Sequence, residues 1–142
     1  MLAAGSRSPD HSKTEMLNLR SLKWKVTETY PFHTSINHVP MIYHNSHFYT
    51  FGAYAGGDVS TVAAFSELTE TWSKVGDLSS GRHGHAAIAY SDYFLMIGGY
   101  GNQPTDKCKL SGNKMVCTPT GDRFTDFVYF PEVFLVPEET CF

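Results

Sequence analysis

The sequence predicts an all-β fold, and three observations support this. From Met16 onward, short runs rich in Val, Ile, Thr, Phe, Tyr and Trp are broken every few residues by Gly, Asn, Asp, Ser or Pro. No window of about 11 residues sustains the apolar stripe of a helix, because 12 glycines and 7 prolines interrupt every candidate. Apolar residues make up 42% of the 142, so the chain can bury one core.

The ends of the chain are expected to lie outside this core. Residues 1–15 mix small, polar and charged side chains without periodicity, which favours a flexible tail. The structured part is expected to be 16–136, with 137–142 as a separate C-terminal end. Met1 to Thr14 lacks the apolar core of a secretory signal, and no segment approaches the roughly 18 apolar residues of a membrane helix.

The charge balance selects no partner class. Lys and Arg total 11 against 14 for Asp and Glu, and neither a basic block nor an acidic tail stands out. Nucleic acid and anionic membranes are therefore not expected partners.

The β-rich region repeats with a period of about 47 residues, and such periods indicate architectures built from stacked units. Three landmarks share this spacing: Trp24 and Trp72 are separated by 48 residues, Tyr43 and Tyr90 by 47, and Phe48 and Phe94 by 46.

Each repeat predicts four strands, and tight polar turns join the first pair of each. The predicted strands are 37–43, 47–52, 60–65 and 70–75 in the first repeat, and 84–90, 93–98, 105–110 and 114–118 in the second. Met16 to Val26 is predicted as the outermost strand of a preceding unit, and Glu132 to Val136 as the opening strand of a following one.

The repeated pattern resembles the Kelch repeat. The run Phe94-Leu95-Met96-Ile97-Gly98-Gly99-Tyr100 enters a diglycine, and Gly52 precedes Trp72 by 20 residues. Gly81-Arg82-His83-Gly84-His85-Ala86-Ala87 then opens the next unit. Over about residues 16–136, the resemblance implies two complete four-stranded antiparallel Kelch-type blades with partial blades on either side. Such a chain would be an open arc of a β-propeller.

The resemblance assigns structural roles to a small set of repeat positions. Glycine tolerates positive φ and lets neighbouring backbone approach closely, and a Trp on an outer strand supplies a large face for packing between sheets. The repeat positions are Gly52, Gly98, Gly99, Trp24, Trp72 and Arg82. Two departures stand out: Ala53 replaces the second glycine of the first repeat, and Cys117 lies near where the second repeat would carry a Trp.

Two of the three cysteines are predicted to form a disulfide. Gly112-Asn113 suits a two-residue turn, and that register places Cys108 opposite Cys117 as a non-hydrogen-bonded pair, whose Cα atoms approach to about 4.5 Å. A disulfide can span this distance. The alternative is two reduced cysteines that fill a small core.

A disulfide would imply an oxidising compartment, so an extracellular or secreted protein is expected, with the cytoplasm as the alternative. Cys141 has no partner in this scheme, and an odd cysteine points to pairing outside the hairpin.

The enzymatic alternative is part of a galactose-oxidase-like copper protein, whose central fold is also a Kelch-type propeller. Copper needs converging His and Tyr ligands, and His83 and His85 are the one tempting pair, since they lie two residues apart. The resemblance gives these positions an ordinary structural role at the start of a blade. We therefore expect no catalytic residue, no metal ligand and no cofactor.

The sequence predicts a non-enzymatic protein-interaction module whose loops carry the contacts. Candidate contact residues in loops 53–59 and 99–106 are Tyr54, Asp58, Tyr100, Gln103 and Asp106. The alternative is a fragment of a larger propeller without independent function. Because propellers have about 4 to 8 blades, an open arc is expected to self-associate or to need further blades that close it.

Overall fold

The computed structural model describes residues 1–4, 13–33, 36–126 and 128–133, and every regular element within them is a β-strand. The strands are β1 (Leu2–Ala4), β2 (Thr14–Asn18), β3 (Lys23–Val26), β4 (Met41–His44), β5 (His47–Tyr54), β6 (Asp58–Ser66), β7 (Thr71–Asp77), β8 (Ala86–Tyr90), β9 (Tyr93–Ile97), β10 (Asp106–Ser111) and β11 (Lys114–Pro119). The predicted all-β class is confirmed. The described residues include no helix long and apolar enough to cross a membrane.

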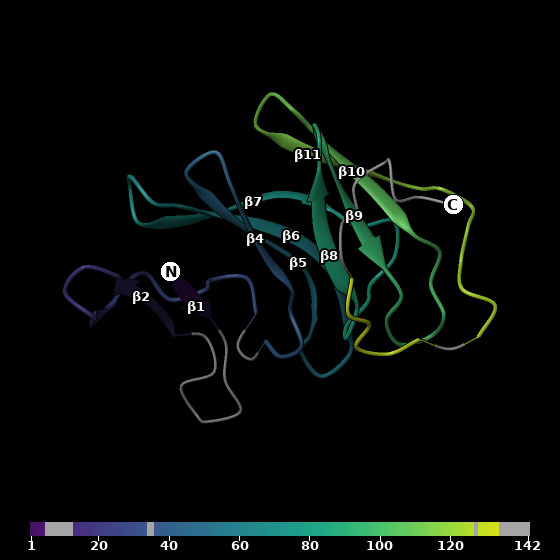
Figure 1. Cartoon of the computed structure of the whole chain (residues 1–142), viewed down its shortest axis with the longest axis horizontal. Coiled ribbons are helices and arrows are strands. Elements are labelled where there is room, and N and C mark those ends of the chain that lie inside the picture. Colours follow the sequence, from purple (N-terminus) through teal and green to yellow (C-terminus); the bar gives the residue numbers. More distant parts are fainter. Residues whose placement is uncertain (5–12, 34–35, 127, 134–142) are drawn as a thin grey trace.

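Strands β4 to β11 form two four-stranded antiparallel meanders (Figure 1). The first meander is β4-β5-β6-β7 and the second is β8-β9-β10-β11, and within each meander consecutive strands pair. Each of the eight strands overlaps one of the eight predicted ranges. Period-2 alternation within the strands and polar turns between them were sufficient to place these elements.

The N-terminal part differs from the prediction in two respects. Residues 16–26 are not one strand, because Asn18 Oδ1 accepts hydrogen bonds from the backbone N–H groups of Arg20 and Ser21 at 2.9 and 3.0 Å and turns the chain between β2 and β3. In addition, β1 lies inside the expected tail and pairs with β2. The remainder of that segment, 5–12, lies outside the described residues.

The two meanders face each other around a shared core. β7 pairs in parallel with β11 along one edge, while β4 lies against β8 along the other. At the first edge Gly76 allows the contact, because a Cβ built there would lie 2.2 Å from the Met115 carbonyl oxygen. The core between the meanders contains Tyr49, Phe51, Val62, Ala64, Leu78, Phe94, Met96, Cys108 and Met115.

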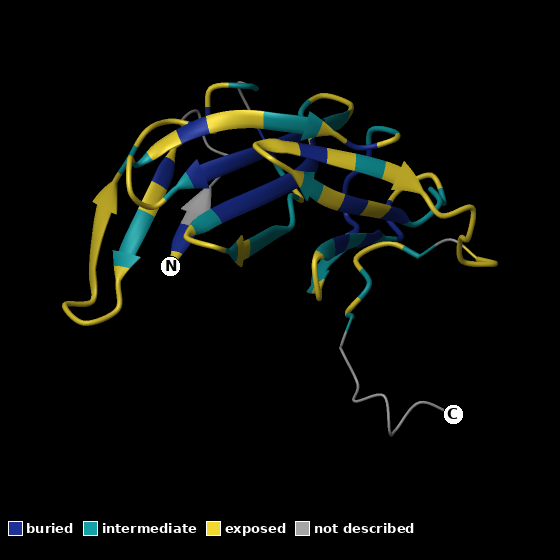
Figure 2. Cartoon of the chain, turned by 90° about the horizontal axis from the view of Figure 1, so that it is seen from above, coloured by how far each residue is buried: buried dark blue, intermediate teal, exposed yellow. Residues whose placement is uncertain are grey.

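A second core lies between the first meander and the N-terminal sheet β1-β2-β3. Trp72 is 7% exposed, its ring contacts Tyr30 and Phe65, and its indole Nε1 donates to Thr14 Oγ1 at 3.0 Å. The described strands therefore form two sheets, the N-terminal sheet and one eight-stranded sheet that contains both meanders. The N-terminal sheet and the two meanders lie as three successive layers, with burial concentrated in the central strands (Figure 2). Trp72 thus belongs to the core between the first two of these layers.

The backbone repeats with a spacing of 46 residues. Positive φ values recur at this spacing in four sets: His38, Gly84 and Phe130; Asn45 and Ser91; Gly52 and Gly98; Gly56 and Asn102. Hydrogen bonds recur likewise, since Gly84 N donates to the His38 carbonyl at 3.3 Å and Phe130 N donates to the Gly84 carbonyl at 2.7 Å. The sequence period of about 47 thus corresponds to a structural repeat that extends to residue 130.

The disulfide between Cys108 and Cys117 is present, and the two residues face each other across β10 and β11 in the predicted register. In the first meander Phe65 and Trp72 occupy the corresponding place, because Phe65 pairs with Phe48 as Cys108 pairs with Phe94. A covalent cross-link therefore replaces an aromatic cross-strand pair. Cys141 and residues 134–136 of the predicted following strand lie outside the described residues.

Gly52→Ala is predicted to destabilise the fold strongly. Gly52 has a φ of 59°, and an added Cβ would lie 2.6 Å from the Arg82 carbonyl oxygen, a backbone atom. The left-handed conformation alone costs a residue with a Cβ about 1–2 kcal/mol. Urea denaturation should show at least this loss, whereas the matched control Gly57→Ala, with nothing within 4 Å, should change little. Equal stability of the two variants would contradict the proposed close approach.

Candidate functional site

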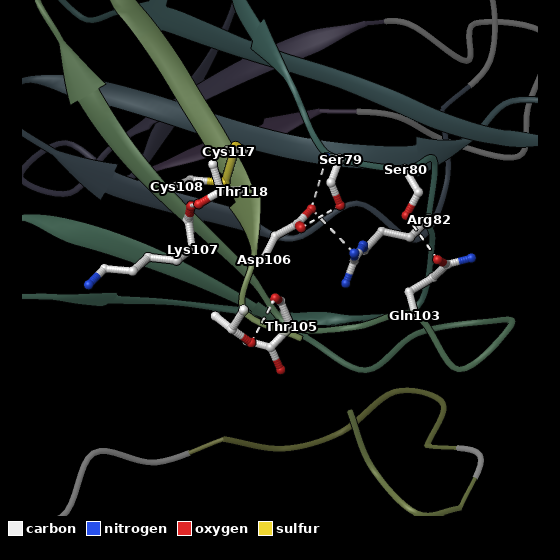
Figure 3. A network of polar contacts seen from close by, with 11 residues as sticks. Ser79, Ser80, Arg82, Gln103, Thr105, Asp106, Lys107, Cys108, Cys117 and Thr118 are labelled. Atoms are coloured by element: carbon white, nitrogen blue, oxygen red, sulfur yellow. Dashed lines mark hydrogen bonds and ion pairs between the residues drawn. A yellow bond between two sulfur atoms is a disulfide. The ribbon is translucent and has the colours of Figure 1, made fainter. Parts of the chain in front are cut away.

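A buried ion pair anchors the connection between the two meanders (Figure 3). Arg82 and Asp106 are both fully buried, and Arg82 Nη2 lies 3.2 Å from Asp106 Oδ2. Asp106 also accepts hydrogen bonds from Ser79, from its backbone N–H at 3.0 Å and from its hydroxyl at 2.5 Å. The segment that leaves β7 is therefore fixed to the first residue of β10.

The backbone of Arg82 fixes the same segment to the first meander. Its carbonyl accepts from Ala53 N at 3.1 Å, and its N–H donates to the Val59 carbonyl at 3.2 Å. Burial lowers the pKa of Arg82 and the Asp106 carboxylate opposes that shift, so the guanidinium stays charged beside its counter-ion. The structural role expected for Arg82 thus has a physical basis.

Asp106 requires a correction, because it was predicted to lie in a contact loop on the surface. The structure buries it completely against Arg82, so its carboxylate does not face solvent. Gln103 lies in the same loop, is half-buried, and accepts a hydrogen bond from the Ser80 hydroxyl at 2.9 Å (Figure 3). These two predicted contact residues therefore hold the loop in place.

Three other predicted contact residues converge on His83. The His83 ring stacks on Tyr100 with a centroid separation of 5.3 Å and contacts Tyr54 at 4.9 Å. Its Nδ1 atom is hydrogen-bonded to Asp58, the first residue of β6. Tyr54 and Tyr100 are separated by 46 residues, so the repeat itself places one tyrosine from each meander beside the same histidine.

The group around His83 extends to residues that the sequence did not single out. Tyr129 lies edge-on to His83 at 5.6 Å, and its hydroxyl lies 3.3 Å from His38 Nδ1. Phe130 contacts the rings of Tyr129 and His38. We call His38, Tyr54, His83, Tyr100, Tyr129 and Phe130 the aromatic cluster. A third copy of the repeat could have indicated Tyr129 and Phe130, because positions 38, 84 and 130 are equivalent in the three copies.

The aromatic cluster is partly open to solvent although its centre is buried. His83 is buried, while Tyr54 and Tyr100 are 40% and 54% exposed. Gly84 lets Tyr129 approach, since a Cβ there would lie 2.0 Å from the Tyr129 ring. The result is a rigid surface of several aromatic rings, and such rings lose little conformational entropy when a partner covers them.

His85 has different surroundings from His83. It is buried, and neither ring nitrogen makes a hydrogen bond of regular geometry among the described residues. Burial, with a smaller contribution from the Arg82 guanidinium, lowers the pKa of His85 to about 3, although a weak interaction with the Phe51 backbone partly opposes the lowering, so the ring is neutral at pH 7. Within the described ranges no group of three or more His, Cys, Asp or Glu side chains could hold a metal ion.

The repeat glycines pack closely against other backbone, whereas one of the two repeat tryptophans is exposed. Gly99 packs against the segment that opens its own unit, where a Cβ would lie 2.9 Å from the His83 carbonyl oxygen, and Gly98 packs against the next unit, where a Cβ would lie 3.0 Å from the Val128 carbonyl oxygen. Trp24 requires a correction: it was expected to pack between sheets, but it is 52% exposed. No described layer lies on the outer side of β3, so this ring lacks the cover that Trp72 has.

Comparison with known proteins assigns no family to the chain. No protein-family model matches the sequence, and no curated protein matches it significantly. The case for any family relationship therefore depends on the residues and the 46-residue repeat described above.

Asp106→Asn is predicted to lower the free energy of unfolding by about 3–5 kcal/mol, because it leaves the buried Arg82 charge uncompensated. The matched control is Asp92→Asn, which removes one partner of the exposed Lys109–Asp92 pair and should change the free energy of unfolding little, because solvent screens such pairs. The double variant Arg82→Met/Asp106→Leu should regain most of the loss. Equal effects of the two Asn variants in urea denaturation would refute the role of the buried pair.

Stability is predicted to fall as the pH falls below about 6.5, partly because of His85. Its pKa is about 3 in the folded chain against 6.5 for an unperturbed histidine, so the unfolded state binds a proton that the folded state excludes between these values. Proton uptake by the unfolded state lowers the free energy of unfolding by up to about 1.4 kcal/mol per pH unit, or by about 2 kcal/mol between pH 7 and 5. His85→Gln should lose less stability than the wild type over this interval, measured by urea denaturation at both pH values. Identical losses would contradict the assignment.

Proposed function

We propose that this chain is a non-enzymatic protein-interaction module built from Kelch-type repeats, with the aromatic cluster as its contact surface. The observation that supports this most directly is the convergence of Tyr54 and Tyr100, from two different repeats, on the buried His83. Tyrosines held on a rigid frame are typical of residues that contribute most to binding. Loops at one end of the strands would then carry the contacts.

In this proposal the two meanders are consecutive blades of an open propeller arc. Three features support it: the antiparallel order within each meander, the face-to-face packing of neighbouring layers, and the 46-residue backbone repeat. Gly52 approaches the Arg82 carbonyl and Gly98 approaches the Val128 carbonyl, each in the next unit. Such regular contact between neighbours is what repeat architectures require.

We further propose that the chain works in an oxidising compartment, because the Cys108–Cys117 disulfide would not persist among cytosolic thiols. An extracellular or secreted setting fits an interaction module whose partner is another protein. The proposal includes no cofactor and no nucleic acid.

The contact surface can be tested with a tyrosine double variant. Tyr54→Ala/Tyr100→Ala should weaken binding to a captured protein partner at least tenfold, since truncation of a central aromatic contact costs more than about 1.4 kcal/mol. Tyr43→Ala is the matched control, because Tyr43 is also 54% exposed but lies at the opposite end of the first meander. Biolayer interferometry should separate them, and an equal affinity loss for control and double variant would argue against this surface.

An activity assay separates the proposal from the copper-enzyme alternative. The purified chain should not oxidise a primary alcohol when copper is supplied. Copper-dependent oxidation that His83→Ala abolishes would instead favour the enzyme.

A further inference from the structure

Two apolar sheet faces, one at each end of the stack of layers, belong to neither hydrophobic core. The N-terminal face consists of Leu17, Trp24 and Val26 with Glu15, which the pairing of β2 and β3 places on one side of the sheet. Trp24 and Val26 are 52% and 59% exposed. The opposite side of the same sheet carries Thr14 and Met16, which contact the first meander.

The C-terminal face lies on the outer side of the second meander. It consists of Ile88, Leu95 and Ile97 with Lys107, and strand pairing brings Ile88 and Lys107 to either side of Leu95. The alternate residues of β9, Phe94 and Met96, face the core between the meanders. Among the described residues, each outer layer of the stack thus has one side in a hydrophobic core and one side in neither core, and Ile88, Leu95 and Ile97 on the second of these sides are half-buried.

The two open faces correspond to faces that already pack against each other inside the molecule. Leu17 and Trp24 form a cross-strand pair like Phe65 and Trp72, which pack against the preceding layer. Leu95 and Ile97 follow Tyr49 and Phe51 by 46 residues, and that pair packs against the next layer. The N-terminal face is therefore of the kind that covers a preceding layer, and the C-terminal face is of the kind that receives a following one.

The charges of the two faces are also complementary. The N-terminal face carries the exposed carboxylate of Glu15, whereas the C-terminal face carries the exposed ammonium group of Lys107, which lies 4.0 Å from the centre of the Tyr93 ring. Two copies of one face would bring like charges together. Contact between the unlike faces instead pairs opposite charges and covers the apolar side chains.

We propose that a second copy of this chain docks head to tail, with its N-terminal face against the C-terminal face of the first. This is a heterologous contact, in which each chain uses a different face, so it continues from copy to copy until a ring closes. The proposal is independent of the aromatic cluster, whose residues belong to neither face.

The test uses two variants that each block one face, Trp24→Glu and Leu95→Glu, with molar mass measured by sedimentation equilibrium. The wild type should exceed the monomer mass of 15.8 kDa, and each variant alone should be monomeric. An equimolar mixture should form a complex of two chains, because one intact face of each kind remains. A monomeric wild type, a variant that still self-associates, or a mixture that stays monomeric would overturn the proposal.

A charge exchange provides a second test with substitutions at exposed positions, which should not impair folding. Glu15→Lys and Lys107→Glu should each weaken association, and the double variant should restore it, because the opposite charges then meet with their signs reversed. Leu68→Glu is the control: Leu68 is 90% exposed in the turn between β6 and β7, outside both faces, and its variant should associate like the wild type. Failure of the double variant to recover would also overturn the proposal.

Discussion

The fold depends on the close approach of backbone between successive layers. Ala53 and Gly99 each donate a backbone hydrogen bond to a carbonyl of the next unit, at Arg82 and Val128. The preceding residues, Gly52 and Gly98, have positive φ and leave no room for a Cβ. Because this geometry recurs every 46 residues, each layer is positioned by the same contact, and the loops that carry Tyr54 and Tyr100 are positioned with it. The aromatic cluster is therefore a product of the repeat.

The parts of the fold that the sequence predicted are those that local chemistry determines. Strand alternation and polar turns located the eight strands of the meanders, and the Gly112-Asn113 turn determined the register that pairs Cys108 with Cys117. These features depend on residues close in sequence. Periodicity added the relation between the two meanders, because equivalent residues recur at nearly constant spacing.

The parts that the sequence did not predict depend on distant neighbours. Asp is a residue type common in surface loops, but Arg82, 24 residues earlier, pairs with Asp106 and holds it in the interior. Trp24 matches Trp72 in spacing, yet only Trp72 has a described layer to cover it. Tyr129 joins the candidate site from beyond the second meander, since the repeat continues to residue 130. A single sequence indicates which residues are equivalent, but not which of them have neighbours.

The exchange of Phe65 and Trp72 for a disulfide gives the two meanders different means of holding their outer strands together. The aromatic pair is effective when another layer shields it from water, as the N-terminal sheet does for Trp72. The bond between Cys108 and Cys117 is covered in the same way, because Cys108 is fully buried in the core against the first meander. Both cross-strand pairs are thus shielded by the layer before them, but only the second is covalent, so the local integrity of its hairpin is tied to the redox state of its surroundings.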